Sequence, residues 1–432
     1  MSIPHSTIRV QLPGGSELPD RSYDIVIGQG AVCSLGAAVR AEGVDRVVLV
    51  ADAAVERSHA AAAEASLRAA GIAASTLAVP AGEASKSVAE AARLWNELAR
   101  LAVDRRTGIV AVGGGVVGDL AGFVAATFAR GLPVWQVPTT LVAQVDSAIG
   151  GKTGINLDAG KNLVGCFWQP RGVLADIDTL RTLPDREFRS GLAEVVKYGM
   201  ILDAEFFAWL EENAEAVLAR EPAALVHVVG RSAALKAHVV ERDEQEKTGL
   251  RAVLNYGHTF AHAYETAAGY GKLLHGEAVA IGMARAARLA ERLGRIGPEL
   301  VSRQDRLLEA LGLPVRVADM AGSRKAEPDE LLAIMGRDKK TVGGRLRFVP
   351  DSDKGNRGPA TMIDFSSGKY QSVDGYGVLG GLYRVEITGY EPLTPEQEKA
   401  GTPPKKLFEF YKVDVELEKK NSVKDFEVPT QK

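Results

Sequence analysis

Residues 109–123 read IVAVGGGVVGDLAGF: an apolar run ends in glycines and continues into a helix-forming stretch that opens at Asp119. The glycines of this junction are Gly113, Gly114, Gly115 and Gly118. Glycine lets backbone N–H groups approach a pyrophosphate at a helix N-terminus, where the helix dipole favours negative charge. The spacing satisfies G-x-G-x-x-G, but the acidic residue expected about twenty positions later is missing, and the strand is not the first of its domain. The motif alone leaves two alternatives open, a dinucleotide site and a tight strand-to-helix turn without a ligand.

Short β-branched runs alternate with Ala-rich helical stretches on both sides of this motif, from about residue 7 to residue 180. The expected strands are residues 6–12, 22–28, 46–52, 107–115, 133–140 and 172–179. Strands and helices in alternation predict a mostly parallel sheet that is covered by helices. We therefore expect an α/β, Rossmann-like nucleotide-binding domain at residues 1–183.

The sequence pattern changes after residue 184: β-branched runs become rare, and long amphipathic helical patterns continue to about residue 337. Leu183 precedes Pro184, and a residue before proline is pushed out of helical conformation, so a domain boundary is expected there. We expect an all-helical second domain at residues 184–349.

The composition changes again near residue 350, where alanine becomes rare: only Ala360 and Ala400 follow. Residues 350–432 are therefore expected to be an atypical tail of unknown role. Within the tail, the pattern of residues 375–390 is compatible with a hairpin, and the Lys/Glu-rich end reads as a solvated linker or tail.

Composition and charge exclude several classes of protein. The net charge is −3, and no Lys/Arg block is interleaved with aromatics, so a nucleic-acid surface is not expected. There is neither a signal-peptide pattern nor a run of about eighteen apolar residues, which indicates a cytoplasmic protein without a membrane span. Cys33 and Cys166 lie far apart, which excludes a disulfide scaffold and a thiolate zinc site. The expected partners are small molecules.

Residues 137–167, VPTTLVAQVDSAIGGKTGINLDAGKNLVGCF, follow an expected strand and are rich in small residues. Their polar side chains include Thr139, Thr140, Asp146, Lys152, Lys161 and Asn162. Two lysines and an asparagine presented by a Gly-rich backbone suit a phosphate or another small anion. A polar surface loop without a ligand remains the alternative.

Residues 254–283, LNYGHTFAHAYETAAGYGKLLHGEAVAIGM, contain three of the seven histidines. On a helix, Asn255, His258, His262 and Glu265 would fall within roughly 80° of one another and share one face. Two histidines at i and i+4 supply two converging metal ligands, and His275 offers another imidazole. A carboxylate from elsewhere would complete such a site, and Glu194, in the apolar helical stretch SGLAEVVKYGM, is the candidate. Capping or core histidines and an exposed Glu194 remain the alternative.

Seven motifs occur together in a fixed order: GGGVVGDLAGF, VPTTLVAQVDSAIGGKTGIN, GKNLVGCFWQP, GLAEVVKYG, LNYGHTFAHAYE, LHGEAVAIGM and DKK. In this combination the chain resembles the 3-dehydroquinate synthase family over about residues 7–349. The resemblance implies a nucleotide-binding α/β domain, a helical metal-binding domain and an active site between them, in a homodimer. Downstream of residue 349 the chain departs from the family pattern, which puts the final helix of the second domain in doubt.

The resemblance also implies roles for individual residues. The metal ligands would be Glu194, His258 and His275, with zinc or cobalt as the ion. The NAD contacts would be Asp52, Glu83, Lys86, Gly114, Gly115, Val116, Asp119, Thr139, Thr140, Lys161 and Thr182. The substrate contacts would be Arg130, Asp146, Lys152, Asn162, Lys197, Lys236, Arg251, Asn255, His262 and Lys340, the last of which sequence does not separate from Lys339.

The implied reaction converts 3-deoxy-D-arabino-heptulosonate 7-phosphate, a phosphorylated sugar acid, into 3-dehydroquinate and phosphate in the shikimate pathway. It comprises oxidation by NAD, phosphate elimination, re-reduction, ring opening and aldol cyclisation. Cyclases that act on sedoheptulose 7-phosphate and polyol dehydrogenases share the scaffold. The cyclases tend to replace the residues that match Asn255, Lys236 and Lys340, because their substrate lacks the carboxylate. All three are retained, which favours the synthase.

Overall fold

The computed structural model describes residues 5–14, 19–158, 160–269, 272–317, 330–331 and 334–335, together with the backbone of two strands near the C-terminus. By its internal contacts the chain divides into two units, Met1–Gly355 and Asn356–Lys432. The first unit contains the predicted α/β and helical parts. Lys339 and Lys340 lie outside the described residues.

A seven-stranded sheet forms the base of the first unit among the described residues. Its strands are β1 (Ser6–Val10), β2 (Tyr23–Gly28), β3 (Arg46–Asp52), β4 (Ala73–Val79), β5 (Gly108–Gly113), β6 (Val134–Pro138) and β9 (Gly172–Asp176). The order is β1-β2-β9-β6-β5-β3-β4, with β1 antiparallel to β2 and all other pairs parallel. The expected α/β fold is confirmed, with β4 as a strand that the sequence pattern did not reveal.

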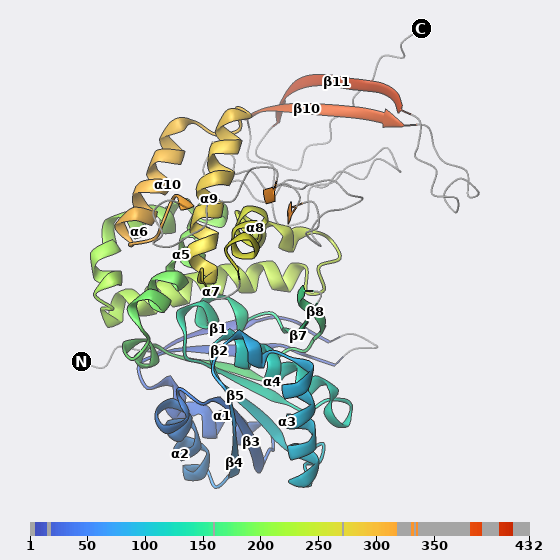
Figure 1. Ribbon diagram of the computed structural model, residues 1–432, viewed down its shortest axis with the longest axis vertical. Coiled ribbons are helices and arrows are strands. Elements are labelled where there is room, and N and C mark those ends of the chain that lie inside the picture. The colour runs from blue at the N-terminus through green and yellow to red at the C-terminus, as the bar shows by residue number, and fades with distance from the viewer. Residues whose placement is uncertain are drawn as a thin grey trace. The chain divides into compact units, whose positions relative to one another are not determined.

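Helices cover both faces of this sheet (Figure 1). The helices α1 (Leu35–Ala41) and α2 (Ala61–Ala69) pack in one apolar cluster, and α3 (Val88–Arg100) and α4 (Gly115–Thr127) pack in another. Successive side chains of β3 join opposite clusters: Val48 belongs to the α3/α4 side and Leu49 to the α1/α2 side. This alternation follows from the strand period of two, and burial on both faces explains the continuous apolar runs.

The strand order reverses between β3 and β5. The chain leaves β3 toward β4 on one side and leaves β5 toward β6 on the other. In open α/β sheets, ligands bind outside the carboxyl ends of the strands at such a switch point. The glycine turn that follows β5 lies at this position.

Two strands form a separate hairpin beside α4: β7 (Lys152–Leu157) and β8 (Gly160–Phe167). Residues 152–167 of the expected anion site or loop therefore form a hairpin and not an irregular loop. Gly122 of α4 allows the close approach, because a Cβ there would lie 2.3 Å from Cγ2 of Thr153.

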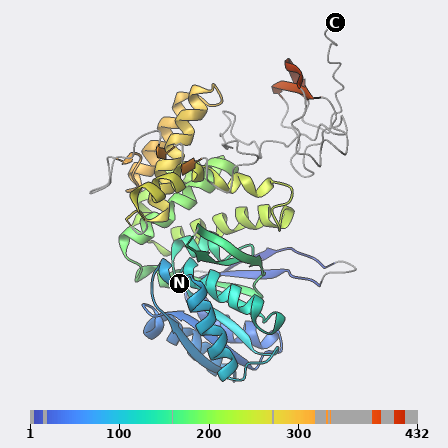
Figure 2. The ribbon, with the colours of Figure 1, turned by 45° about the vertical axis from the view of Figure 1, so that its right-hand side comes forward.

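The second part of this unit is helical and lies above the sheet in both ribbon views (Figures 1 and 2). Its helices are α5 (Asp185–Leu202), α6 (Ala204–Leu218), α7 (Pro222–Arg242), α8 (His258–Ala268), α9 (His275–Arg292) and α10 (Pro298–Ala310). The first unit also contains short helical turns, in both of its parts: η1 (Ala31–Ser34), η2 (Glu56–Ala60), η3 (Glu83–Ser85), η4 (Phe128–Arg130), η5 (Ala143–Ser147), η6 (Ile177–Arg181) and η7 (Leu250–Asn255). The helix α5 begins directly after Pro184, as expected from the sequence.

Among the described residues, one helix is long and apolar enough by composition to cross a membrane, the 21-residue α7. Its most apolar window is 61% buried inside the protein. The helix packs against α5, α6 and β1, as a core helix does.

The second unit contains a two-stranded antiparallel sheet of β10 (Gly381–Tyr390) and β11 (Lys406–Leu417). The prediction for this part of the tail needs correction. Residues 375–390 do not supply both strands of a hairpin, because β10 pairs with residues 406–417, which the Lys/Glu-rich composition had marked as solvated tail. In that stretch apolar and charged residues alternate, which is the pattern of a strand. The high content of charged residues had concealed this alternation.

Candidate metal and nucleotide site

Glycine sets the spacing between α5 and α9. A Cβ on Gly276, the second residue of α9, would lie 1.7 Å from the backbone oxygen of Ser190 in α5. The backbone N–H of Gly276 also donates a hydrogen bond to Oγ of Ser190, at 3.0 Å. This contact brings the start of α9, and with it His275, against α5. Ser190, the contact residue of α5, lies about one helical turn before Glu194.

A second glycine contact fixes the start of α8. Gly257 has φ +77°, and a Cβ there would lie 2.6 Å from the backbone nitrogen of Met283 in α9. This left-handed residue starts α8 at His258 and separates it from η7, in which Asn255 is the last residue. The prediction that Asn255 shares a helix with His258 is therefore wrong, because the backbone turns between them.

Glu194, His258 and His275 offer three ligand atoms that all lie within 4.8 Å of one another. Oε1 of Glu194 lies 3.5 Å from Nε2 of each histidine. Donors about 2.1 Å from a tetrahedral zinc ion are separated by about 3.4 Å, so these spacings fit such an ion. Three protein ligands would leave one position open, as in catalytic rather than structural sites.

The carboxylate of Glu194 supports the same interpretation. The residue is 1% exposed, and within the described part of the chain neither of its oxygens accepts a hydrogen bond. Lys197, one turn later in α5 and equally buried, lies against Oε2 as an ion pair. A buried carboxylate without hydrogen bonds is costly unless a cation is close, and a divalent ion would satisfy Oε1.

Charge in this cluster shifts the pKa values of its members. Burial opposes ionisation of Glu194, but Lys197 and His275 outweigh burial and hold the pKa of Glu194 below its usual value. Burial alone would lower the pKa of His275, but the carboxylates of Glu194 and Glu265 prevail and raise that pKa to about 10. The three residues Glu194, Lys197 and His275 therefore interact strongly as one charged cluster.

A second polar cluster lies next to the first. Asp146, in η5, accepts hydrogen bonds from the hydroxyl of Tyr198 at 2.8 Å and from Nζ of Lys236 at 2.7 Å. Burial would raise the pKa of Asp146, but Lys236 and Lys197 hold it well below its usual range. Burial lowers the pKa of Lys236 to about 8, although Asp146 opposes the shift. The charge of Lys197 acts on both Glu194 and Asp146, so the two clusters adjoin.

The glycine turn after β5 lies at the switch point of the sheet. A Cβ on Gly113 would lie 3.2 Å from Cβ of Asp52, at the end of β3, and one on Gly114 would lie 3.1 Å from Cγ2 of Thr140. Gly114 is the N-cap of α4, and no side chain caps this helix. The first N–H groups of α4 are therefore placed to bind an anion.

The other predicted nucleotide contacts come from several elements. Lys86 and Asp119 form an ion pair, and burial raises the pKa of Asp119 although Lys86 opposes the shift. Oε1 of Glu83 accepts a hydrogen bond from Asn156, at 2.7 Å. Gly115 and Val116 form the first turn of α4, and Thr139 is buried directly after β6. Thr182, which follows η6, forms a 2.8 Å hydrogen bond with His59.

The predicted substrate contacts are only partly brought together. Lys197 and Lys236 belong to the joined clusters, and His262 lies one turn beyond His258, with their ring centroids 5.7 Å apart. Lys152 forms an ion pair with Glu246, and the charges of Asp146 and Arg251 also act on it. Arg251 is 2% exposed and donates to the backbone oxygen of Glu244, at 2.7 Å.

Three more predicted contacts come from other elements. Lys161 and Asn162 lie at the start of β8, and Asn162 has φ +55° while its N–H donates to Oδ1 of Asn156. Arg130 ends η4, beyond the C-terminal end of α4. A 13-residue helix is about 20 Å long, so Arg130 lies far from the glycine turn of the same chain.

Two residues of the cluster had no role in the sequence prediction, Tyr198 and Glu265. Tyr198 gave no signal, because its partner Asp146 comes from a distant part of the chain. Glu265 did give one, since it lies on the predicted face of α8 with His258 and His262.

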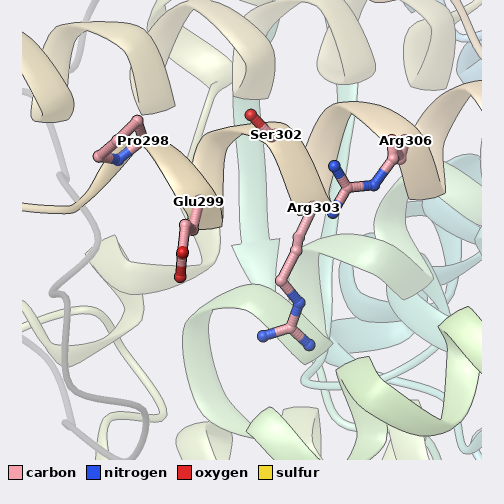
Figure 3. A pocket seen from close by; sticks show the side chains of 5 residues that line it. All are labelled: Pro298, Glu299, Ser302, Arg303 and Arg306. Carbon is pink, nitrogen blue, oxygen red and sulfur yellow. The ribbon is translucent and has the colours of Figure 1, made fainter.

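A surface hollow elsewhere offers no comparable chemistry. Its lining residues are Pro298, Glu299, Ser302, Arg303 and Arg306, all from α10 (Figure 3). Arg303 is already paired with Glu211. The metal-binding geometry therefore makes the first cluster the candidate site.

Comparison with known proteins points to one family. The family models described as 3-dehydroquinate synthase N-terminal and C-terminal match residues 76–190 and 191–341. The chain is 49% identical over 342 residues to the 3-dehydroquinate synthase of Rhodopirellula baltica, which covers 77% of this chain and 90% of the relative.

Solved structures of sugar-phosphate cyclases share the fold. A 2-deoxy-scyllo-inosose synthase in complex with carbaglucose-6-phosphate, NAD+ and Co2+ matches with a TM-score of 0.72 and 29% identity, over 82% of this chain and 94% of that one. The 2-epi-5-epi-valiolone synthase of Streptomyces hygroscopicus, with NAD+ and Zn2+, matches with a TM-score of 0.71 and 28% identity, over 81% and 95%. Since the two family models together match more than half of its length, this chain belongs to the 3-dehydroquinate synthase family.

Proposed function

We infer that this chain is a 3-dehydroquinate synthase, which converts 3-deoxy-D-arabino-heptulosonate 7-phosphate into 3-dehydroquinate and phosphate. The observation that carries this inference is the triad of Glu194, His258 and His275, which lies beside the buried Lys197 and Lys236. The identity of 49% over 342 residues to a 3-dehydroquinate synthase supports the same inference. A phosphorylated sugar acid bears two anionic groups, and such a cluster suits them.

The cofactors are NAD and a divalent ion, Zn2+ or Co2+, as in the solved relatives. When bound, NAD accepts and returns a hydride, while the ion polarises the hydroxyl that is oxidised. Glu194, His258 and His275 hold the ion. In this assignment the nucleotide would bind at the uncapped N-terminus of α4 and the carboxyl ends of β3 and β5, beside Asp52 and Thr140.

The remaining residues bind and orient the substrate. Lys236 supplies a buried cation for an anionic group of the substrate, and Asp146 and Tyr198 fix the position of its ammonium group. Lys197 keeps the Glu194 carboxylate ionised, so that it can serve as a ligand. His262, beside the ligand His258 but outside the triad, faces the substrate in this assignment.

The assembly and the domain division belong to the same proposal. A homodimer is supported by Arg130, which lies about 20 Å from the glycine turn of its own chain and would reach a substrate only from a second copy. Domains at residues 1–183 and 184–349 are supported by the start of α5 after Pro184, with residues 350–432 as a tail. We assign the enzyme to the cytoplasm, with no membrane or nucleic acid as a partner.

The test is a phosphate-release assay with the heptulosonate phosphate, NAD and metal. Prolonged chelation should abolish phosphate release, and added Zn2+ or Co2+ should restore it. Omission of NAD from nucleotide-free protein should also abolish it. Full activity in chelator-treated, metal-free protein would contradict the proposed role of the triad.

A further inference from the structure

Glu265 lies beside the metal ligand His275 but is not part of the triad. Its Oε1 is 3.6 Å from Nδ1 of His275, whereas Nε2 of the same ring faces Glu194 at 3.5 Å. The two ring nitrogens therefore face two different carboxylates. The side chain of Glu265 is 12% exposed, and that of His275 is 40% exposed, so the carboxylate is mostly removed from water while part of the ring is not.

In both histidines of the triad, Nδ1 faces an oxygen acceptor, at hydrogen-bond distance in His258 and slightly farther in His275. Nδ1 of His258 lies 3.2 Å from the backbone oxygen of Tyr256, a hydrogen-bond acceptor. Nδ1 of His275 faces the carboxylate of Glu265, another acceptor. A neutral imidazole that donates from Nδ1 leaves the lone pair of Nε2 for a metal ion. Both rings therefore present Nε2 toward Glu194.

Lys161, in the hairpin of β7 and β8, also lies near Glu265. Its Nζ, at the start of β8, lies 3.8 Å from the same Oε1 of Glu265. A mostly buried carboxylate needs an opposite charge or hydrogen bonds to remain ionised. With Lys161 on one side and His275 on the other, the carboxylate is fixed between the hairpin and α9.

We propose that Glu265 is a positioning residue for the metal site: it fixes the ring of His275 and its Nδ1–H tautomer, so that Nε2 points at the ion. The proposal rests on the metal site of the proposed function and adds a residue outside the ligand set. A carboxylate that accepts from a metal-bound imidazole also raises the basicity of the ligand, and loss of such a partner typically weakens metal binding about 10–100-fold.

The test measures zinc affinity by competition with a chelator for wild type, Glu265→Gln and Glu265→Asp. Glu265→Gln keeps the size of the side chain but removes its charge, and it should bind zinc about 10–100-fold more weakly than wild type. Glu265→Asp retains the charge and should bind zinc more tightly than Glu265→Gln. The visible absorption of bound Co2+ should change in Glu265→Gln, because the spectrum reports the ligand geometry.

Glu211→Gln is the matched control, since it removes a glutamate of the helical part that pairs with Arg303 and contacts no residue of the triad. It should bind zinc like wild type, and unfolding midpoints of the metal-free proteins identify variants that fail to fold. Wild-type zinc affinity and an unchanged Co2+ spectrum in folded Glu265→Gln would overturn the proposal. Failure of wild type itself to bind zinc would contradict the metal site, and the role of Glu265 with it.

Discussion

Glu194 and Lys197 form an ion pair that is almost completely removed from water, with side chains 1% and 2% exposed. Such a pair seldom stabilises a protein, because desolvation of two charges offsets their attraction. The proposed metal site explains the pair better, because the lysine would keep the carboxylate of a proposed ligand ionised in an apolar helix. Sequence could predict Glu194 as a ligand because an acidic residue in an apolar run needs a partner. It could not show that Lys197 is adjacent in space.

His258 and His262 provide a matched pair of substitutions on one helix. His258→Ala removes one of three ligands and should strongly lower the metal content of the purified protein. His262→Ala should retain the metal but lose rate, because His262 lies outside the triad. Metal analysis and phosphate-release rates of both variants provide the test. Equal metal retention would remove the ligand assignment.

The pKa of Lys236 predicts how kcat/KM falls at alkaline pH. Burial lowers its pKa from 10.5 to about 8, so the side chain is charged below that pH and neutral above it. If the ammonium binds a substrate anion, kcat/KM should fall as the pH rises through about 8. In Lys236→Arg the cation persists, so the fall should move to higher pH, whatever the absolute rate. An unchanged alkaline limb in this variant would assign the limb to another group.

At the scale of elements, patterns local in sequence were predictable and contacts between distant segments were not. Strand and helix periodicity identified β1, β2, β3, β5, β6 and β9. The pattern missed β4, and the hairpin of β7 and β8, because these Ala-rich and Gly-rich strands contain few of the β-branched residues that mark a strand. The break before α8 was also missed, since it depends on Gly257 packing against α9, a contact across the chain.

Gly276→Ala tests how the helices position the ligands. The new methyl would lie 1.7 Å from the oxygen of Ser190, so α9 and α5 must separate, and His275 must move with α9. Unfolding free energy should fall by about 1–3 kcal/mol or more, with weaker metal binding. The control is Gly230→Ala in α7, where a Cβ meets nothing within 4 Å and helix propensity should add up to about 1 kcal/mol. Denaturant unfolding and zinc affinity of both variants would decide this.

For the whole molecule, the described residues of the proposed site all lie in Met1–Gly355, while Asn356–Lys432 forms a unit of its own. The family match ends at residue 341. All described residues with an assigned role lie before residue 276. Sequence composition located the change of texture near residue 350, but no chemical motif in the tail indicated a function.

Removal of the chain after residue 355 should therefore leave zinc and NAD affinity within about twofold of wild type, because no ligand or assigned contact is lost. Phosphate release should persist as well. Thermal unfolding reports separately any packing that the tail contributes. Loss of NAD or metal binding in a truncated protein that remains folded would show that the tail takes part in the site.

The most direct test of the synthase assignment follows phosphate and NADH together during turnover of 3-deoxy-D-arabino-heptulosonate 7-phosphate. Hydride leaves and returns within one catalytic cycle, so we predict one phosphate released per substrate consumed and no net increase in NADH absorbance. NADH accumulating in proportion to substrate, without release of phosphate, would contradict the assignment and identify a simple dehydrogenase on the same scaffold.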